Sequence, residues 1–355
     1  MSENQGSESK NASKAAHKVA VLGGGSFGTA MAKVLGENGH DVHFWMRDPA
    51  QVQEISQSRI NSRYMPDITL SGSIHPTTDF ASAVDGAEIV FVAIPSKAFR
   101  GVIREHVSDF SNGQIVVSLT KGIEQHGFKL MSEILQEEIP RAHVGVLSGP
   151  NLAGEIVNED LTATVIAAKD PLVRSKVQEL LGCSYLRVYA NVDVYGVELA
   201  GALKNIYAIV SGMAAALDLG ENAKAMLITR SLAEMSRFAV SLGANPMTFM
   251  GLAGVGDLVV TCTSSKSRNF RVGYAVGKGA ELDDAVAEIG QVAEGIYTLL
   301  LVKQKAEEIG IYMPLVRGLY DILYGGASIK AVIGSLMMAV QNSDVEFILP
   351  RVLTH

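Results

Sequence analysis

The chain has 355 residues, of which 48% are hydrophobic and 19% are charged, and its formal net charge is −7. At roughly 150 residues per domain, this length predicts two domains, or one large one, with a sizeable core. The acidic balance argues against nucleic acid as the main partner, because the chain has no general basic field to neutralise phosphates. A small phosphorylated substrate is still allowed, since it needs only a few local cations.

The cysteines and the chain ends indicate the compartment. Cys183 and Cys262 lie far apart in the sequence, which implies no disulfide framework and fits a reducing cytosol. Residues 1–16 are polar and lack the apolar core of a signal peptide, so we expect a disordered tail. Apolar runs such as residues 208–217 are too short and too interrupted to span a bilayer. We therefore expect a cytoplasmic protein without stable membrane insertion and, since no metal-ligand spacing occurs, without a metal site.

Short apolar runs rich in β-branched residues recur along the first half of the chain. Segments of helical periodicity separate most of them, and this alternation predicts βαβ units and a mostly parallel, doubly wound sheet. Because the runs are almost continuously apolar, we expect both faces of the sheet to be buried. The expected strands are residues 18–22, 41–46, 88–94, 114–119, 143–147, 162–168 and 186–190.

After residue 193 the pattern changes to successive helices without clear strands. The expected helices are residues 193–217, 221–242, 268–278, 294–309, 314–323 and 328–340. The predicted fold class is therefore α/β plus all-α, with a sheet domain at residues 17–192, an all-helical domain at residues 193–342 and a tail at residues 343–355. Exposed apolar helices in the second domain also favour a homodimer.

The glycine pattern Gly23-x-Gly25-x-x-Gly28 follows the first predicted strand and opens a helix. In this context Gly23 permits a tight turn, Gly25 lets the backbone approach a pyrophosphate, and Gly28 lets the helix pack close to the strand. The free N–H groups of the helix N-terminus add a positive dipole end for the phosphates. The pattern predicts a dinucleotide-binding domain of the Rossmann type rather than a ligand-free turn.

The end of the second strand bears on the choice between NADP and NAD. Arg47 stands about 20 residues past the glycines, where an NAD site usually has an acidic residue. A guanidinium there matches a 2′-phosphate, so NADP is favoured. The alternative is that Arg47 is a solvated charge and Asp48 accepts from the ribose. Pro95 and Phe99 follow the next strand of the nucleotide site and are expected to line it, although Phe99 is equally suited to the core.

Lys204 lies in an otherwise apolar helical segment. Its neighbours one turn away are Ala200, Gly201, Tyr207 and Ala208, so its face is small and mostly apolar. Burial lowers the pKa of a lysine, which suits proton exchange with an alcohol oxygen during hydride transfer. A lysine that covers apolar surface with its stem is the competing interpretation.

A polar loop at a predicted helix start contains Ser267, Arg268 and Asn269. A guanidinium, an amide and free helix N–H groups together would bind a dianionic phosphate. A capped helix with an exposed arginine is the alternative that local sequence favours.

Two other stretches of unusual composition lie after a strand or in a loop, where catalytic groups concentrate: residues 118–122, and residues 254–258 with Thr261.

Together these stretches resemble the soluble, bacterial type of NAD(P)-dependent glycerol-3-phosphate dehydrogenase. The resemblance spans residues 18–340 in the family's order, and the combination is far more specific than any single motif. The motifs are GGGSFGTA (23–30), IPS (94–96), TKGIE (120–124), SGPNLA (148–153), ELAGALKNI (198–206), GLAGVGDL (251–258), TCT (261–263), SRN (267–269) and VAEG (292–295).

The resemblance implies a role for each matching residue. Lys204 would be the proton donor to the carbonyl of dihydroxyacetone phosphate, with Lys121 and Asp257 as the other catalytic residues. The implied substrate contacts are Lys121, Gly149, Asn151, Lys204, Asp257, Thr261, Ser267, Arg268 and Asn269. The implied cofactor contacts are Gly23, Gly25, Ser26, Phe27, Gly28, Arg47, Pro95, Phe99, Lys121, Ala153, Arg268, Val292 and Glu294. The product, sn-glycerol 3-phosphate, would serve glycerophospholipid synthesis.

The chain departs from the family pattern at three positions. Gly24 replaces a common Ala, Phe27 a common Trp or Tyr, and Asn151 a common Ser, which weakens a role for that side chain.

Two rival functions are also compatible with the sequence. One is a dehydrogenase of the same architecture that acts on a 3-hydroxyacid or a sugar-phosphate acid, and the other is a dinucleotide sensor without turnover.

Overall fold

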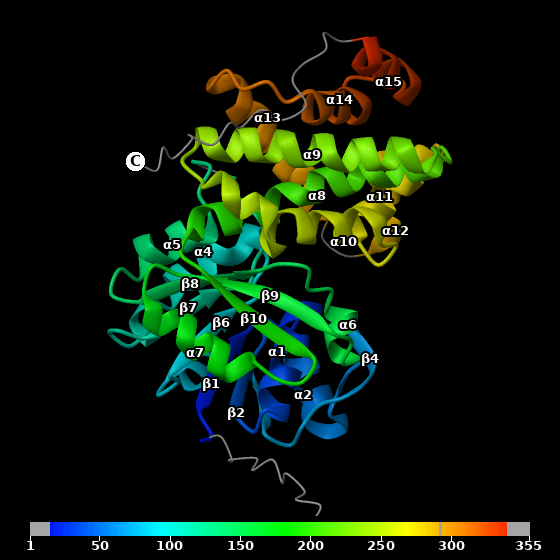
Figure 1. Ribbon diagram of the computed structural model, residues 1–355. Coiled ribbons are helices and arrows are strands. Elements are labelled where there is room, and N and C mark those ends of the chain that lie inside the picture. Colours follow the sequence, from blue (N-terminus) through cyan, green and yellow to red (C-terminus); the bar gives the residue numbers. More distant parts are fainter. Residues whose placement is uncertain (1–14, 126, 291–292, 339–355) are drawn as a thin grey trace, which may run out of the picture.

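The computed structural model describes residues 15–125, 127–290 and 293–338 and contains two regions (Figure 1). Residues 18–191 form one large sheet with helices on its faces, called here the sheet region. Residues 194–338 form a stack of helices against it, called here the helical region. The predicted tails at residues 1–16 and 343–355 lie almost wholly outside the described residues.

The large sheet has the order β10-β9-β8-β7-β6-β1-β2-β5. All neighbouring strands are parallel except β8 and β9, which are antiparallel, so the prediction of a mostly parallel sheet is confirmed. The strand order reverses between β1 and β6, and such a switch point is where this kind of sheet binds ligands. The strands are β1 (Lys18–Leu22), β2 (Asp41–Trp45), β5 (Ile74–Thr77), β6 (Ile89–Val92), β7 (Ile115–Ser118), β8 (His143–Ser148), β9 (Thr162–Ala167) and β10 (Leu186–Asn191).

The sequence prediction missed three short strands between residues 60 and 77. β3 (Ile60–Asn61) and β4 (Met65–Thr69) form a small antiparallel pair, and β5 extends the large sheet beside β2. Pro66 and Pro76 interrupt this stretch, and proline argues against a strand in the middle of a sheet. β5 tolerates Pro76 because it is an edge strand.

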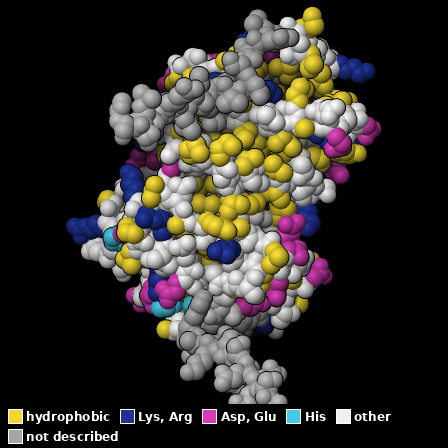
Figure 2. Space-filling model, in the orientation of Figure 1, with side chains coloured by type: hydrophobic (Ala, Val, Ile, Leu, Met, Phe, Trp, Pro, Cys, Tyr) yellow, Lys and Arg dark blue, Asp and Glu magenta, His cyan; other side chains and the backbone are white. Residues whose placement is uncertain are grey.

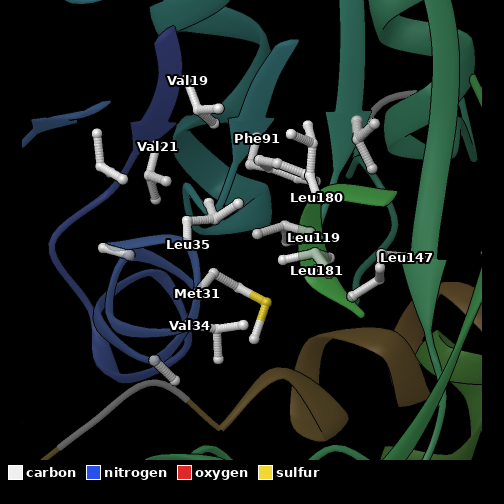
Figure 3. Packing of buried hydrophobic residues seen from close by; sticks show 14 of the residues in the cluster. Val19, Val21, Met31, Val34, Leu35, Phe91, Leu119, Leu147, Leu180 and Leu181 are labelled. Atoms are coloured by element: carbon white, nitrogen blue, oxygen red, sulfur yellow. The ribbon is translucent and has the colours of Figure 1, made fainter. Parts of the chain in front are cut away.

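Helix α1 (Ser26–Glu37) is anchored to the sheet through its apolar side. Met31, Val34 and Leu35 are almost fully buried and belong to the same cluster as Val21 of β1 and Phe91 of β6 (Figure 3). Burial of side chains of this size stabilises the fold by about 1.5–3 kcal/mol each. This packing fixes the glycine loop that joins β1 to α1.

The other helices of the sheet region are mostly crossover connections between strands. They are α2 (Pro49–Ser58), α3 (Phe80–Val84), α4 (Ser96–Glu105), α5 (Met131–Glu138), α6 (Ala153–Val157) and α7 (Pro171–Leu181), with a short 3₁₀ turn, η1 (Val107–Asp109). Phe99 of α4 is fully buried in a cluster with Val92 and Ile103, so it is a core residue. This burial favours the core role, and the dinucleotide contact by this side chain stays a prediction.

Helix α8 (Val194–Ala216) is the centre of the helical region (Figure 1). Asp193 begins it by accepting a hydrogen bond from the N–H of Gly196 at 2.9 Å. α8 is long and apolar enough to cross a membrane, but 89% of its most apolar 18-residue window is buried inside the protein. It is therefore the core helix of the helical region, which agrees with the expectation of no membrane insertion.

All six predicted helices of the helical region are confirmed within about two residues. They are α8, α9 (Glu221–Ser241), α11 (Arg268–Gly277), α13 (Glu294–Glu308), α14 (Pro314–Leu323) and α15 (Ile329–Met338). The elements that were not predicted are η2 (Pro246–Met250), the π-helical turn η3 (Leu252–Gly256), α10 (Asp257–Thr263) and α12 (Leu282–Ile289). α10 matters most for function, because Asp257 and Thr261 lie on it.

Candidate active site

The glycine loop between β1 and α1 has the geometry of a dinucleotide cradle. Gly23 has a φ of +121°, and a Cβ there would lie 2.5 Å from the carbonyl oxygen of Ala93. A Cβ at Gly28 would lie 1.9 Å from the carbonyl oxygen of Gly23, whereas a Cβ at Gly25 would meet nothing within 4 Å. No described side chain caps the start of α1. The open space at Gly25 and the uncapped helix N-terminus fit a pyrophosphate.

Two side chains that sequence reasoning missed hold this loop in place. Gln51 Nε2 donates to the carbonyl oxygen of Gly24 at 2.6 Å, and Asn61 Nδ2 donates to the same oxygen at 3.0 Å. Asn61 Nδ2 also donates to Thr29 Oγ1 at 2.7 Å. Asn61 lies on β3, a strand that was not predicted, so its position could not be inferred from the local pattern.

Arg47 follows the end of β2 with an exposed side chain. The neighbouring Asp48 begins α2, and its Oδ1 accepts the N–H of Ala50 at 2.9 Å. One carboxylate oxygen of Asp48 is therefore used for helix capping, which weakens the alternative in which Asp48 binds the ribose. Pro95, at the start of α4, is exposed beyond the carboxyl end of β6.

Two lysines and one aspartate form the centre of the site. Lys121 Nζ donates to Asp257 Oδ2 at 2.8 Å, and Lys204 Nζ donates to Asp257 Oδ1 at 2.5 Å. Lys204 also donates to Thr261 Oγ1 at 2.7 Å. Asp257 is fully buried and Lys204 is 6% exposed, so the aspartate interacts with both cations away from bulk water. We call this group the lysine–aspartate–lysine cluster.

Four separate elements bring the cluster together. Lys121 follows β7, and its Nζ also donates to the carbonyl oxygen of Gly149 at 3.0 Å and to Asn151 Oδ1 at 2.7 Å. Gly149 and Asn151 follow β8, Lys204 lies on α8, and Asp257 begins α10. The cluster therefore lies where the carboxyl ends of β7 and β8 meet the helical region, the edge of the sheet at which ligands are expected.

The charges of the cluster do not cancel, since two ammonium groups share one carboxylate. Burial lowers the pKa of Lys121 from its usual value and the nearby charge of Lys204 lowers it further, while Asp257 opposes the shift. The side chain of Lys121 is 19% exposed, so it retains some access to solvent. An excess of positive charge in a largely dry site favours an anionic substrate and a developing alkoxide.

The predicted phosphate-binding residues lie at the start of α11, but they are not equivalent. Arg268 Nη2 donates to Ser26 Oγ at 3.4 Å, which brings this guanidinium to the N-terminus of α1. Ser267 caps α11 by accepting the N–H of Phe270 at 3.3 Å. Burial lowers the pKa of Arg268, and Tyr64 and Glu294 oppose this shift. A partly desolvated guanidinium beside a helix N-terminus can bind a phosphate of the substrate or of the dinucleotide.

Both polar groups of the Asn269 side-chain amide already make hydrogen bonds within the protein. Oδ1 accepts the N–H of Gly295 at 3.0 Å, and Nδ2 donates to Asn205 Oδ1 at 3.0 Å. The side chain therefore joins α11 to α8 and α13, and one Nδ2 hydrogen is left for a ligand. This bracing role was not predicted from the local sequence.

Glu294 is the point where α13 meets the sheet region. Its carboxylate accepts from Ser96 Oγ at 2.7 Å and from the N–H of Ser96 at 3.4 Å, at the start of α4. Burial raises the pKa of Glu294, and the donors of Ser96 oppose the shift. Ala153, at the start of α6, is half-buried, whereas Val292 lies outside the described residues.

A doubly wound sheet with a glycine-rich turn at its switch point and a buried lysine pair under a helical region defines a class of protein, the nucleotide-dependent dehydrogenases. Comparison with known proteins narrows this class. The family model for the N-terminus of NAD-dependent glycerol-3-phosphate dehydrogenase matches residues 18–173, and the model for the C-terminus matches residues 193–334. The chain belongs to the NAD-dependent glycerol-3-phosphate dehydrogenase family, and it is an NAD(P)-dependent oxidoreductase.

Individual relatives agree with this assignment. A glycerol-3-phosphate dehydrogenase (NAD(P)+) from Pseudomonas syringae pv. syringae (strain B728a) is 58% identical over 330 residues, which cover 93% of this chain and 96% of the relative. One from Azotobacter vinelandii is 57% identical, with 93% and 97% covered. The crystal structure of glycerol-3-phosphate dehydrogenase from Coxiella burnetii matches with a TM-score of 0.87 at 35% identity, covering 91% of this chain and 99% of that chain.

Proposed function

We propose that this chain interconverts dihydroxyacetone phosphate and sn-glycerol 3-phosphate in the cleft between the sheet region and the helical region. NADP is the favoured cofactor and NAD the alternative. The observation that carries the proposal is the lysine–aspartate–lysine cluster, which lies at the carboxyl ends of β7 and β8, the edge of the sheet at which ligands are expected. The product would supply glycerophospholipid synthesis.

The chemical step needs a hydride and a proton. The bound, reduced nicotinamide would supply the hydride to C2 of the ketone. Lys204 donates a proton from Nζ to the carbonyl oxygen, becomes a neutral amine, and takes the proton back in the oxidation direction. Lys121 places a second positive charge beside the developing alkoxide. Asp257 accepts hydrogen bonds from both ammonium groups and holds them in position.

The remaining residues bind and orient the two ligands. Arg268 binds the phosphate of the substrate, with Ser267 and the free amide hydrogen of Asn269 beside it. Gly149, Asn151 and Thr261 shape the pocket around the lysines. Because the phosphate is remote from C2, its binding orients the substrate for hydride transfer without taking part in it. Gly23, Gly25, Ser26, Phe27, Gly28, Pro95, Ala153, Val292 and Glu294 contact the dinucleotide, and Arg47 its 2′-phosphate.

The first test is turnover of dihydroxyacetone phosphate with NADPH and NADH in parallel, followed by loss of reduced nicotinamide absorbance. We expect turnover with both and a preference for NADPH. Arg47→Ala should raise the KM for NADPH by roughly tenfold or more and leave NADH use unchanged, because the guanidinium pairs with a group that NADH lacks. Arg141→Ala, at an exposed arginine just before β8, is the matched control.

The other outcomes have definite meanings. A clear preference for NADH would keep the enzyme and remove Arg47 as a ligand of the 2′-phosphate. Folded protein that binds the cofactor but does not reduce dihydroxyacetone phosphate would contradict the proposed substrate. Turnover of a 3-hydroxyacid or a sugar-phosphate acid would then identify a related dehydrogenase, and binding without any turnover would identify a dinucleotide sensor.

We further propose a cytoplasmic homodimer of two-domain subunits, divided at residues 17–192 and 193–342. Support for the dimer comes from the helical region, where the apolar helix α15 buries none of its described side chains. Met337 and Met338 are 63% and 87% exposed. Hydrophobic side chains also gather over the helical region on the face in Figure 2. Exposed apolar surface of this kind is typical of subunit contacts.

A further inference from the structure

A buried carboxylate links the two regions of the protein close to the proposed active site. Glu198 of α8 is 2% exposed. Its Oε1 accepts the N–H of Ser132 at 3.1 Å, and its Oε2 accepts Ser132 Oγ at 2.5 Å. Ser132 lies in the first turn of α5, where the residue before the helix, Leu130, provides no polar cap. Glu198 therefore caps a helix of the sheet region from the core helix of the helical region.

The same helix carries Lys204, about 9 Å further along its axis at 1.5 Å per residue. Gly201 lies between the two and marks a second close contact with the sheet region. A Cβ at Gly201 would lie 2.4 Å from Ser148 Oγ of β8 and 3.6 Å from Lys121 Cγ. The orientation of α8 is therefore set by two neighbouring contacts with the sheet region, one at Glu198 and one at Gly201.

We propose that Glu198 is a positioning residue for the reaction, which fixes the place of Lys204 relative to the sheet region and its bound dinucleotide by capping α5. This inference rests on the proposed function, in which Lys204 is the proton donor. Glu198 does not touch the lysine–aspartate–lysine cluster through any described contact. It acts through α8, because a rigid helix transmits a shift at one turn to the turns that follow.

The titration of Glu198 provides a second measurement besides the rate itself, which is the pH dependence of kcat. Burial raises the pKa of Glu198 to about 7, and the donors of Ser132 oppose this shift. Glu133 of α5 adds to it, and Tyr195 of α8 is the other titratable side chain that interacts with Glu198. Glu198 changes its charge, and so the strength of its bonds to Ser132, within the pH range of an ordinary assay. The rate of the reaction should follow that change.

Glu234 of α9 provides a matched control. It is also 2% exposed, and burial also raises its pKa to about 7. It caps a helix in the same way, because its two oxygens accept the N–H groups of Leu315 at 3.0 Å and Val316 at 2.9 Å, at the start of α14. Both helices belong to the helical region, so Glu234 stabilises that region without contacting the sheet region.

The experiment compares Glu198→Gln with Glu234→Gln in the full-length protein. We expect Glu198→Gln to lower kcat by roughly tenfold or more and to keep the KM for the dinucleotide within roughly twofold. It should also remove a step near neutral pH from the kcat profile. Glu234→Gln should lower the melting temperature about as much as Glu198→Gln does. It should, however, keep the wild-type kcat and the step near neutral pH.

Equal kcat values and equal pH profiles for the two variants, beside an active wild type, would overturn the role of Glu198. The turnover of the wild type in the same assay tests the proposed function separately. If Glu198→Gln does not fold, Ser132→Ala takes its place, because it keeps the carboxylate and the backbone bond and removes only the hydroxyl donor. We expect a severalfold loss of kcat for Ser132→Ala, and a wild-type kcat would count against the proposal.

Discussion

Asp257 accepts hydrogen bonds from Lys121 and Lys204 through different oxygens. Its negative charge raises the pKa of Lys121 against the effect of burial. Without that charge, the pKa of Lys121 would fall further, because burial and the nearby charge of Lys204 both lower it. At the scale of single residues, the proposed chemistry therefore depends on Asp257 as much as on the proton donor.

Replacement of Asp257 by Asn should lower kcat for ketone reduction at neutral pH by roughly 100-fold, with partial recovery at lower pH as Lys121 regains its proton. The measurement is the pH profile of kcat with dihydroxyacetone phosphate. Asp170→Asn is the control, since Asp170 caps α7 away from the cluster. It should keep the wild-type kcat and nearly the wild-type stability, because Asn caps a helix about as well as Asp. A wild-type profile for Asp257→Asn would rule out this role.

Single residues differ in how far the sequence reveals them. The glycine pattern and the apolar neighbours of Lys204 are local features, so both could be predicted from the sequence alone. The partner of Lys204 could not, because Asp257 lies 53 positions away on a helix that was not predicted. Gln51 and Asn61 reach the glycine loop through tertiary contacts that have no local pattern.

At the scale of elements, two buried glutamates accept hydrogen bonds at the start of helices other than their own. α5 follows Leu130 and α14 follows Met313, and each receives this capping from a glutamate on another helix, while Glu133 of α5 also accepts the N–H of Leu130. Burial raises the pKa of both glutamates from 4.5 to about 7. The folded state therefore binds protons that the unfolded state releases between these two values, and stability from this source falls as pH rises through the window.

The prediction at this scale is a pH-dependent stability difference between the wild type and Glu234→Gln. The glutamine does not titrate. The difference in the free energy of unfolding, wild type minus variant, should therefore increase as pH falls from 8 to 5. The gain should be on the order of 3 kcal/mol. Urea unfolding at both pH values measures it. A difference that is constant with pH, or that shrinks toward pH 5, would contradict the assignment of a raised pKa to Glu234.

Long helices could be predicted because their apolar periodicity extends over many turns, and short ones could not. η3 and α10 depend on a close contact rather than on a pattern. A Cβ at Gly254 would lie 2.3 Å from the Cα of Phe249, so this turn forms only because a glycine is present. The short strands β3 to β5 likewise take their places from pairing and not from composition.

At the scale of the whole molecule, the alternation of strands and helices predicted the doubly wound sheet and the change to a helical region near residue 193. It did not predict that β9 and β10 run antiparallel to the rest of the sheet. An apolar strand buried on both faces has the same sequence pattern in either direction. The reversal occurs between β8 and β9, which are joined by residues 149–161 with the short helix α6.

Three of the polar contacts between the two regions are the lysine–aspartate–lysine cluster, the pair Glu198 and Ser132, and the pair Glu294 and Ser96. Each of them joins a residue of the helical region to the carboxyl-end side of the sheet or to a helix that follows it. The position of Lys204 relative to the sheet region, and with it the proposed reaction, therefore depends on contacts between the two regions.

The most direct test of this account is the kcat of Lys204→Ala with dihydroxyacetone phosphate and NADPH, with NADPH binding measured in parallel. We predict a loss of kcat of roughly 1,000-fold, unchanged affinity for NADPH, and partial recovery when a small primary amine is added, because the variant lacks only the proton donor. Lys224→Ala, an exposed lysine on α9, should behave as wild type. A kcat for Lys204→Ala within a few-fold of the wild type would contradict the proposal that this lysine supplies the proton.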